Sequence, residues 1–274
     1  MPGETLEAAI EAGRKLGSSD VGSVFTILGE DVSTEAEARA VVSEYLALID
    51  AIRDRGIDGE ISVKPTQLGL ALGGALAGDC VGTLGEAAAR AGVPMWLDME
   101  ASDTVEATLE LYRGLRALHD QAGLCLQAYL RRTAEDLESL LPLRPRIRLV
   151  KGAYAEPAAV AFSRKSEVDE AYLGLTSTLL TAAARGQATC ILGTHDTRII
   201  DEARKEAHAL GVPPGGLEVH MLYGIRVDEQ ARLTREGLPL KVLISYGSNW
   251  FPWYMRRLAE RPANLWFVAR SLLP

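Results

Sequence analysis

One pattern recurs eight times along this chain of 274 residues: a short apolar run, then polar residues, then a segment of helix-forming composition. The run at 24–29 illustrates it, because β-branched and aromatic residues end at a glycine and are followed by Ser33 and Thr34. Hydroxyl side chains at such positions accept hydrogen bonds from the first turn of a helix, which we expect to continue through about Arg53. The sequence therefore predicts strands that alternate with helices.

The expected strands are at residues 24–29, 60–63, 95–97, 124–130, 146–150, 188–193, 217–222 and 240–246. The expected helices are at residues 4–16, 35–53, 84–92, 104–118, 133–141, 166–185, 197–210, 227–236 and about 249–260. Strands that alternate with helices form parallel sheets, and eight such units in about 250 residues is the size of a (β/α)8 barrel. A doubly wound open sheet remains the alternative, because counting strands does not show closure. No linker-like tract divides the chain, so we expect one domain over residues 1–274.

Charge and cysteine content narrow the class of protein. Charged residues make up 24% and hydrophobic residues 47% of the chain, which is ordinary for a globular protein. The net charge of -8 argues against general nucleic-acid binding, because it requires no strongly basic face. Three widely spaced cysteines, Cys80, Cys125 and Cys190, fit a reducing compartment better than a disulfide framework. The N-terminal residues hold no apolar run long enough for a signal sequence or a membrane span, so we expect a cytoplasmic protein.

One expected strand carries two positive charges on one face. Arg146 and Arg148 lie two residues apart in the strand at 146–150, and apolar residues occupy the other face. Because an unpaired guanidinium inside a sheet is costly, the cationic face must meet something anionic. Gly152, just after the strand, allows backbone N–H groups to approach a ligand closely. We therefore predict that this segment holds a cofactor.

Polar side chains end six consecutive expected strands. Active sites of (β/α)8 barrels lie at the carboxyl ends of the strands, so these residues would meet at one mouth. Lys64 and Asp98 end neighbouring strands and could pair there, which would lower the cost of burying their charges. Each residue alone is as consistent with a structural role as with a functional one, whereas together they predict a binding site. The ring consists of Lys64, Asp98, Gln127, Arg148 with Lys151, His195 with Asp196, and Glu218 with His220.

Two of these segments raise the alternative of a metal site. Residues 194–196 and 218–220 together hold two histidines and two carboxylates, which are ligands of transition metals. A cluster of arginine and lysine side chains at the same mouth would repel a divalent cation. We therefore expect an organic cofactor and no metal at this site.

Arg256 and Arg257 are adjacent in the expected last helix, and Glu260 follows one turn after Arg256. Consecutive helical residues point about 100° apart, so a helix packed on the core would normally expose both arginines. A helix lying across the mouth of the barrel would instead let the pair grip a carboxylate, with Glu260 holding one guanidinium in place.

The segments RLVKGAY at residues 148–154 and YMRRLAE at residues 254–260 together resemble the proline dehydrogenase family, whose members are flavin enzymes on a (β/α)8 barrel. The likeness extends over most of the chain, from about residue 64 to residue 273. The combination is specific, although no single piece is. The matching pieces also include Lys64-Pro65, WLDME at residues 96–100, THD at residues 194–196 and MLYG at residues 221–224.

The resemblance implies that the chain oxidises L-proline to 1-pyrroline-5-carboxylate in proline catabolism, by hydride transfer from C5 of proline to N5 of FAD. Electrons would pass to a quinone or another acceptor, with peripheral contact at the inner face of the membrane as an open alternative. The residues implied to bind substrate are Lys64, Leu222, Arg256 and Arg257, and those implied to assist catalysis are Asp98 and Arg148. The residues implied to contact FAD are Met99, Gln127, Arg148, Val150, Lys151, Gly152, Ala153, Thr194 and His195.

These implied roles agree with the chemistry of the side chains. Arg148 would lie beside the flavin N5 and stabilise the reduced ring, because a hydride acceptor becomes electron-rich. Asp98 would order Lys64, which helps the arginine pair to clamp the substrate carboxylate, and Leu222 would pack on the substrate ring.

Two departures from the family pattern leave the substrate open. The family commonly has tyrosines where this chain has Leu243, four residues before Gly247, and Trp253, three before the arginine pair. Tyr246 or Tyr254 would restore these groups only if an insertion or deletion shifted the alignment. Otherwise the pocket is more apolar or differently shaped, and a substituted proline or another cyclic imino acid becomes an alternative substrate. A flavin-binding barrel without proline turnover, and another barrel flavoenzyme resembling methylenetetrahydrofolate reductase, are the remaining alternatives.

Overall fold

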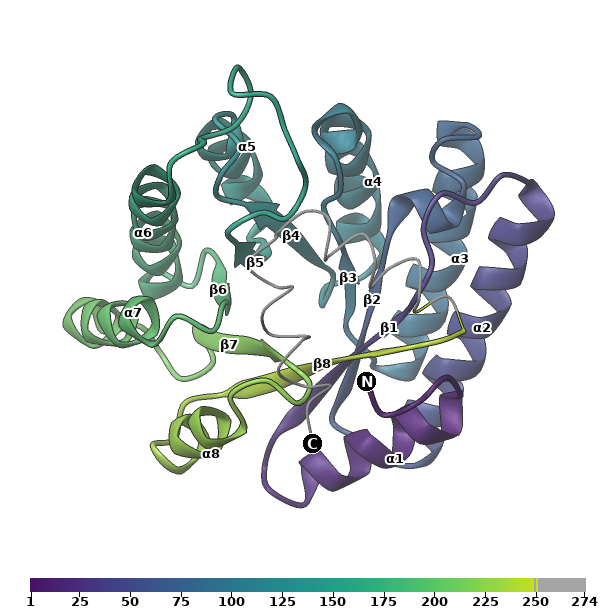
Figure 1. The fold of residues 1–274 in the computed structure, drawn as a ribbon, viewed down its shortest axis with the longest axis horizontal. Coiled ribbons are helices and arrows are strands. Elements are labelled where there is room, and N and C mark those ends of the chain that lie inside the picture. Colours follow the sequence, from purple (N-terminus) through teal and green to yellow (C-terminus); the bar gives the residue numbers. More distant parts are fainter. Residues whose placement is uncertain (249, 251–274) are drawn as a thin grey trace, which may run out of the picture.

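The computed structural model describes residues 1–248 and 250, and within them eight parallel strands close into a barrel in sequence order (Figure 1). The first strand pairs with both the second and the eighth, so the sheet has no free edge. The predicted (β/α)8 barrel is confirmed, and the open doubly wound sheet is excluded. The strands are β1 (Gly22–Ile27), β2 (Gly59–Val63), β3 (Met95–Leu97), β4 (Gly123–Gln127), β5 (Arg146–Val150), β6 (Thr189–Gly193), β7 (Leu217–Leu222) and β8 (Leu240–Tyr246).

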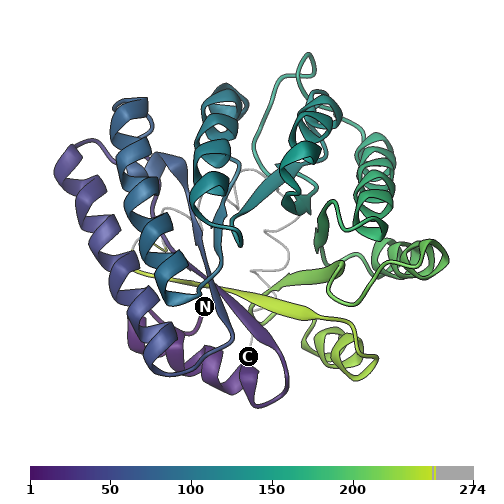
Figure 2. The same ribbon diagram turned by 180° about the vertical axis from the view of Figure 1, so that it is seen from behind.

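Helices surround the barrel on its outside, as the two opposite views in Figures 1 and 2 show. In the described part of the chain, no helix combines the length and the apolar character that a membrane span requires. The helices are α1 (Leu6–Gly17), α2 (Glu35–Asp54), α3 (Gly74–Ala91), α4 (Val105–Leu118), α5 (Thr133–Leu140), α6 (Lys165–Ala184), α7 (Thr197–Leu210) and α8 (Val227–Arg235). Short 3-10 helices lie at η1 (Pro65–Leu68), η2 (Ser102–Thr104) and η3 (Leu141–Leu143).

The start of α2 follows the prediction. The Thr34 hydroxyl accepts a hydrogen bond from the backbone N–H of Glu37, and the Glu37 carboxylate accepts one from the backbone N–H of Thr34. This reciprocal pair satisfies two N–H groups that a helix terminus leaves without partners.

Most predicted elements match the observed ones within a few residues, with two exceptions. Helix α3 begins at Gly74, well before the expected start at residue 84, because Gly74, Gly78 and Gly82 lower its helix propensity and obscure the pattern. The strand expected at 124–130 ends at Gln127, since the residues after it form a turn. Apart from residue 250, the helix expected at 249–260 falls on residues outside the described ones.

The main hydrophobic core lies between the barrel and the surrounding helices. Strand residues alternate between this outer core and the barrel interior. In β8, Val242 and Ile244 are fully buried in the outer core, whereas Lys241 and Leu243 face inward. The three cysteines are unbonded and buried, as the sequence predicts. The outer core thus stabilises the fold and leaves the inner face of the sheet to a different set of side chains.

The barrel interior holds a small apolar cluster of its own. Val24, Trp96 and Ile191 form this cluster, and Leu243 packs against it. The Trp96 ring lies across β4, so a Cβ atom on Gly123 would come within 2.4 Å of it. The indole ring therefore requires glycine at this position.

Gly123→Ala is expected to destabilise the fold by about 1–3 kcal/mol, because the added methyl group overpacks the barrel interior against Trp96. Urea unfolding measures the free energy difference. Gly114→Ala in α4 is the matched control, since a Cβ atom there meets nothing within 4 Å. Alanine should stabilise that helix by about 0.5–1 kcal/mol. Equal stability of the two variants would contradict this account of Gly123.

Candidate active site

Arg148 lies on the inner face of β5, and only 5% of its side chain is exposed. Its Nη2 donates hydrogen bonds to Ser62 Oγ at 2.7 Å and to the Asp98 carboxylate. Ser62 donates to Asp98 Oδ1 at 3.0 Å, and Lys64 Nζ lies 3.9 Å from Asp98 Oδ2. Burial lowers the pKa of Arg148 and the Asp98 carboxylate raises it, with a net upward change that keeps the guanidinium charged. The predicted pairing of Lys64 with Asp98 is confirmed, and Asp98 joins both cations.

The loop that carries Lys64 is fixed by buried hydrogen bonds. Thr66, in η1, donates from its backbone N–H and its hydroxyl to the Glu100 carboxylate at 2.9 and 2.8 Å. Gln67 Nε2 donates to Ile27 O at 2.9 Å and ties the same loop to the end of β1. Burial raises the pKa of Glu100 to about 7, so this carboxyl group titrates near neutral pH. The position of the Lys64 ammonium group thus depends on a buried acid.

The ends of β4 and β5 are shaped by close backbone contacts. Gln127 Nε2 donates to Met99 O at 3.1 Å, and the Gln127 carbonyl oxygen accepts from Thr133 Oγ1 at 2.6 Å. Gly152 has a φ of 115°, and a Cβ atom there would lie 2.2 Å from the Tyr129 ring. Both the backbone conformation and the available space therefore require glycine just after β5.

Lys151 follows β5, and its ammonium group is already paired. Its Nζ lies 2.6 Å from Asp169 Oδ1 and 3.2 Å from Asp196 Oδ2. Burial raises the pKa of Asp196, whereas hydrogen bonds from Arg198 and Lys151 lower it, and the net value is about 2. Two carboxylates therefore contact Lys151, and each is shared with a second cation, Asp169 with Lys165 and Asp196 with Arg198.

His195, just after β6, carries a neutral imidazole ring. Its Nε2 accepts from the backbone N–H of Leu222 at 3.2 Å, which leaves the ring proton on Nδ1. Burial lowers the pKa of His195, and the nearby Arg226 lowers it further. Thr194 Oγ1 accepts from the backbone N–H of Asp196 at 3.1 Å and orders the same loop. The His195 ring is thus held in one tautomer beside the end of β7.

Three buried polar atoms at these strand ends have no hydrogen-bond partner among the described residues. They are Arg148 Nη1, Gln127 Oε1 and His195 Nδ1, from β5, from β4 and from the loop after β6. Buried polar groups are nearly always hydrogen-bonded, so these two donors and one acceptor indicate a polar ligand. They come from two neighbouring strands and from the loop after the next strand, which is the arrangement expected around one bound molecule.

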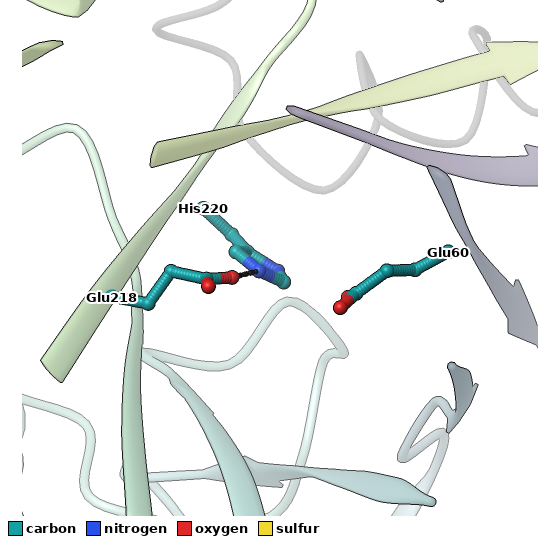
Figure 3. Close-up of side chains that lie close together, drawn as sticks. All are labelled: Glu60, Glu218 and His220. Atoms are coloured by element: carbon teal, nitrogen blue, oxygen red, sulfur yellow. Dashed lines mark hydrogen bonds and ion pairs between the residues drawn. The ribbon is translucent and has the colours of Figure 1, made fainter. Parts of the chain in front are cut away.

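The sequence places Glu218 and His220 at the mouth of the barrel, and this prediction is wrong. Glu218 is the second residue of β7, and the strand continues past His220 to Leu222. Figure 3 shows both side chains extending toward Glu60, which lies near the start of β2. His220 Nε2 lies 2.5 Å from Glu218 Oε1. The two residues therefore lie inside the barrel, toward the amino-terminal ends of the strands, which we call its lower half.

This placement also argues against the metal site that the sequence raised as an alternative, because its two pairs of residues do not come together. His195 and Asp196 lie after the carboxyl end of β6, whereas the group of possible metal ligands within the described residues is Glu60, Glu218 and His220. The ligand-type atoms of that group lie within 4.8 Å of one another. The metal alternative thus loses two of its four proposed ligands.

The lower cluster, defined as Glu60, Arg146, Glu218 and Lys241, lines a cavity of about 550 Å³ at the amino-terminal ends of the strands. Glu60 is fully buried and accepts from Arg146 Nη2 at 3.0 Å, and Lys241 Nζ lies 3.2 Å from it. These cations already neutralise the carboxylate, which disfavours a metal ion there.

Sequence reasoning missed Glu60 and Lys241. In β2, Glu60 and Ser62 alternate with the apolar residues Ile61 and Val63, and this pattern was the available signal of a polar inner face.

The remaining predicted residues divide into two groups. Met99 is buried after β3, Val150 ends β5 half-buried, and Ala153 lies in the loop beyond it. The predictions for Arg256, Arg257, Glu260, Trp253 and Tyr254 fall on residues outside the described ones.

Known proteins resemble this chain over nearly all of its length. A profile of the proline dehydrogenase family matches residues 9–270. Proline dehydrogenase 1 of Bacillus subtilis subsp. natto is 37% identical over 271 residues, which cover 99% of this chain and 88% of that protein. Proline dehydrogenase of Deinococcus radiodurans is 36% identical over 278 residues, with the same two coverages of 99% and 88%.

A solved structure shows the same fold. Proline utilization A from Bdellovibrio bacteriovorus, inactivated by N-propargylglycine, superposes with a TM-score of 0.86 at 22% sequence identity. The likeness covers 94% of this chain, which spans only 32% of that larger protein.

Glu100 gives a testable pH dependence of stability. Its pKa is about 7 instead of 4.5, so the folded state binds more protons than the unfolded state between these values, and stability falls as pH rises through that window. Glu100→Gln removes the titration and keeps an acceptor for Thr66. The stability of the variant relative to wild type should therefore rise by about 2–3 kcal/mol from about pH 4.5 to about pH 8. Urea unfolding across this range measures the difference, and identical pH dependence of the two proteins would contradict the buried acid.

Proposed function

This chain belongs to the proline dehydrogenase family, and from that premise we propose how it oxidises proline in proline catabolism. The residues at the mouth of the barrel would hold FAD, which would supply at N5 an acceptor for the hydride of C5 of L-proline. The electron pair of the C5–H bond would pass to the flavin and the proline nitrogen would lose a proton, which gives 1-pyrroline-5-carboxylate. The part of the protein is to hold the two molecules face to face and to stabilise the charge that develops. We propose that residues 1–274 form one barrel domain.

The buried guanidinium of Arg148 carries this proposal. Asp98 and Ser62 hold its Nη2, while its Nη1 is buried without a partner among the described residues. A fixed cation beside the hydride acceptor lowers the barrier, because the acceptor becomes electron-rich. We therefore assign Arg148 and Asp98 to catalysis, with Arg148 beside the flavin N5 and Asp98 as the group that orders it.

The residues around Arg148 fit a flavin. Gln127 offers an acceptor and His195 a donor, and both atoms are buried and unpartnered among the residues described. Gly152 leaves the backbone after β5 open to a close approach. The proposed FAD contacts are Met99, Gln127, Arg148, Val150, Lys151, Gly152, Ala153, Thr194 and His195.

The carboxylate of proline must be clamped so that C5 faces the flavin. The proposed clamp is Lys64 with Arg256 and Arg257, because paired guanidinium groups bind a carboxylate bidentately. Asp98, 3.9 Å from Lys64 Nζ, orders the lysine. Leu222 is 45% exposed at the end of β7, which supports its packing on the proline ring.

The electron acceptor in this proposal is a quinone, reached through peripheral contact with the inner face of the membrane, or another acceptor. The three unbonded cysteines support a reducing cytoplasm as the location. We propose no nucleic-acid partner, because a net charge of -8 disfavours binding to the phosphate backbone.

Leu243 favours a second substrate class as the alternative. It pairs in register with Leu222, on the inner face of β8, at the level proposed for the substrate ring. Tyr246 does not supply the missing phenol, because it belongs to the outer core on the opposite face of β8. A more apolar pocket suits a proline with a ring substituent, or another cyclic imino acid.

A visible spectrum recorded before and after anaerobic addition of L-proline tests the proposed function. The purified protein should show flavin absorbance that bleaches on addition. Protein that binds no added FAD would overturn the proposal. Flavin-loaded protein that binds a proline analogue without bleaching would favour a barrel without turnover. Bleaching by NADH but not by proline would favour a flavoenzyme of another class.

Leu243→Tyr is expected to lower kcat/KM for ring-substituted prolines relative to L-proline, because the phenol narrows the pocket beside Leu222. A change of about tenfold in that ratio is within the range that pocket contacts supply. Steady-state kinetics with L-proline and a ring-hydroxylated proline measures the ratio. Tyr246→Phe, on the outer face of the same strand, is the control. A ratio that stays constant in Leu243→Tyr would remove Leu243 from the substrate pocket.

A further inference from the structure

Trp96 stands at the centre of a network in the barrel interior. The Cζ atoms of Arg146 and Arg148 lie 5.1 and 4.9 Å from the centroid of its ring. The His220 ring meets the indole in a T-shaped arrangement, with 5.4 Å between centroids and 75° between planes. Trp96 Nε1 donates a hydrogen bond to Glu60 Oε2 at 2.5 Å. One buried side chain therefore contacts both arginines of β5 and the acid of the lower cluster.

Glu60 fixes the orientation of this indole. Burial raises the pKa of Glu60, but Arg146 and Lys241 lower it to about 2, so the carboxylate stays ionised. Its Oε1 is held by Arg146 at 3.0 Å and by Lys241 at 3.2 Å, which leaves Oε2 for the indole N–H. A charge-assisted hydrogen bond to a carboxylate held in this way restrains the plane of the Trp96 ring.

Gly123 restrains the ring from a second side. The indole lies against this glycine, within 2.4 Å of where a Cβ atom would stand. The Trp96 ring is therefore restrained both by its contact with Gly123 and by its hydrogen bond to Glu60.

Arg148 needs a support of this kind. The side chain is buried and also interacts with Cys125, but Asp98 and Ser62 hydrogen-bond only to its Nη2, so these two bonds alone do not fix the plane of the guanidinium. A guanidinium over an aromatic face is held by the attraction between the cation and the ring. Trp96 thus restrains the Arg148 guanidinium at a second point, so that its Nη1 points in one fixed direction.

We infer that Trp96 is a positioning residue that sets the direction of the Arg148 guanidinium, and that Glu60 acts on Arg148 through Trp96. The contacts of Trp96 with Arg148 and Glu60 are the basis for this positioning role. Its consequence for flavin reduction rests on the proposed function, because Arg148 is assigned there to the flavin N5.

Three variants separate this role from general packing. Trp96→Phe keeps an aromatic face but removes the donor to Glu60, and Trp96→Leu removes both. Tyr172→Phe is the matched control, because Tyr172 is fully buried on α6 and its hydroxyl donates to Leu149 O at 2.8 Å, on the outer side of β5. Urea unfolding shows that each variant is folded and ranks their stabilities.

Nuclear magnetic resonance of the full chain tests the positioning whether or not flavin is bound. Rotation about the Nε–Cζ bond of Arg148, assigned by the signal that Arg148→Lys removes, should become about tenfold faster in Trp96→Phe. It should be faster still in Trp96→Leu and unchanged in Tyr172→Phe. A rate that stays at the wild-type value in Trp96→Phe and Trp96→Leu, or that rises equally in Tyr172→Phe, would overturn the inference.

Flavin-loaded protein tests the consequence. A less well directed Arg148 stabilises the reduced flavin less, so the midpoint potential should become more negative in Trp96→Phe. The rate of flavin reduction at saturating proline should fall about tenfold with KM unchanged. Trp96→Phe should add nothing further in an Arg148→Lys background, because coupled residues are not additive. Additive effects would overturn the inference. Protein that binds no flavin would refute the proposed function and leave the rotation rate to decide the role of Trp96.

Discussion

The buried ion pair between Arg148 and Asp98 is the constraint on which the barrel interior depends. Removing both charges from water is expensive, and their attraction offsets that loss only when further hydrogen bonds complete the pair. Ser62 contacts both partners, Lys64 approaches Asp98 from the mouth, and Trp96 covers the guanidinium from within. The outer core of helices and strands bears the stability of the fold, so the interior can hold charges in place of apolar side chains.

The two ends of the barrel differ in how their charges are matched. Each member of the lower cluster has a partner: Arg146 and Lys241 meet Glu60, and Glu218 meets His220. At the mouth, Arg148, Gln127 and His195 each keep a buried polar atom without a partner among the described residues. Such atoms are not confined to the mouth, since His220 Nδ1 also lacks a partner among those residues, but at the mouth they come from neighbouring strand ends and can face one molecule.

The sequence predicted much of this arrangement because strand alternation is a local property. The spacing of Arg146 and Arg148 placed both on the inner face and required anionic partners, which are Glu60 and Asp98. The positions of Glu218 and His220 were beyond the sequence, since the end of a strand depends on pairing with distant residues. Helix α3 was too short in the prediction because tertiary packing, and not propensity, sustains its glycine-rich first half.

The pairing of Lys151 was also unpredictable for a physical reason. Its partners, Asp169 at the start of α6 and Asp196 before α7, approach it only after the barrel has formed. A motif can identify which residue type a ligand needs. It does not show how much of the charge other side chains have already balanced.

Closure of the barrel by β8 has a consequence for the barrel interior. Lys241 is one of the two cations that neutralise Glu60, and β8 is also the strand that covers the free edge of β1. In a chain without β8, Glu60 would lack one of its two cationic partners, and the edge of β1 would be unpaired. The surroundings of Glu60, and of the Trp96 ring that it holds, are therefore complete only when β8 has paired with β1.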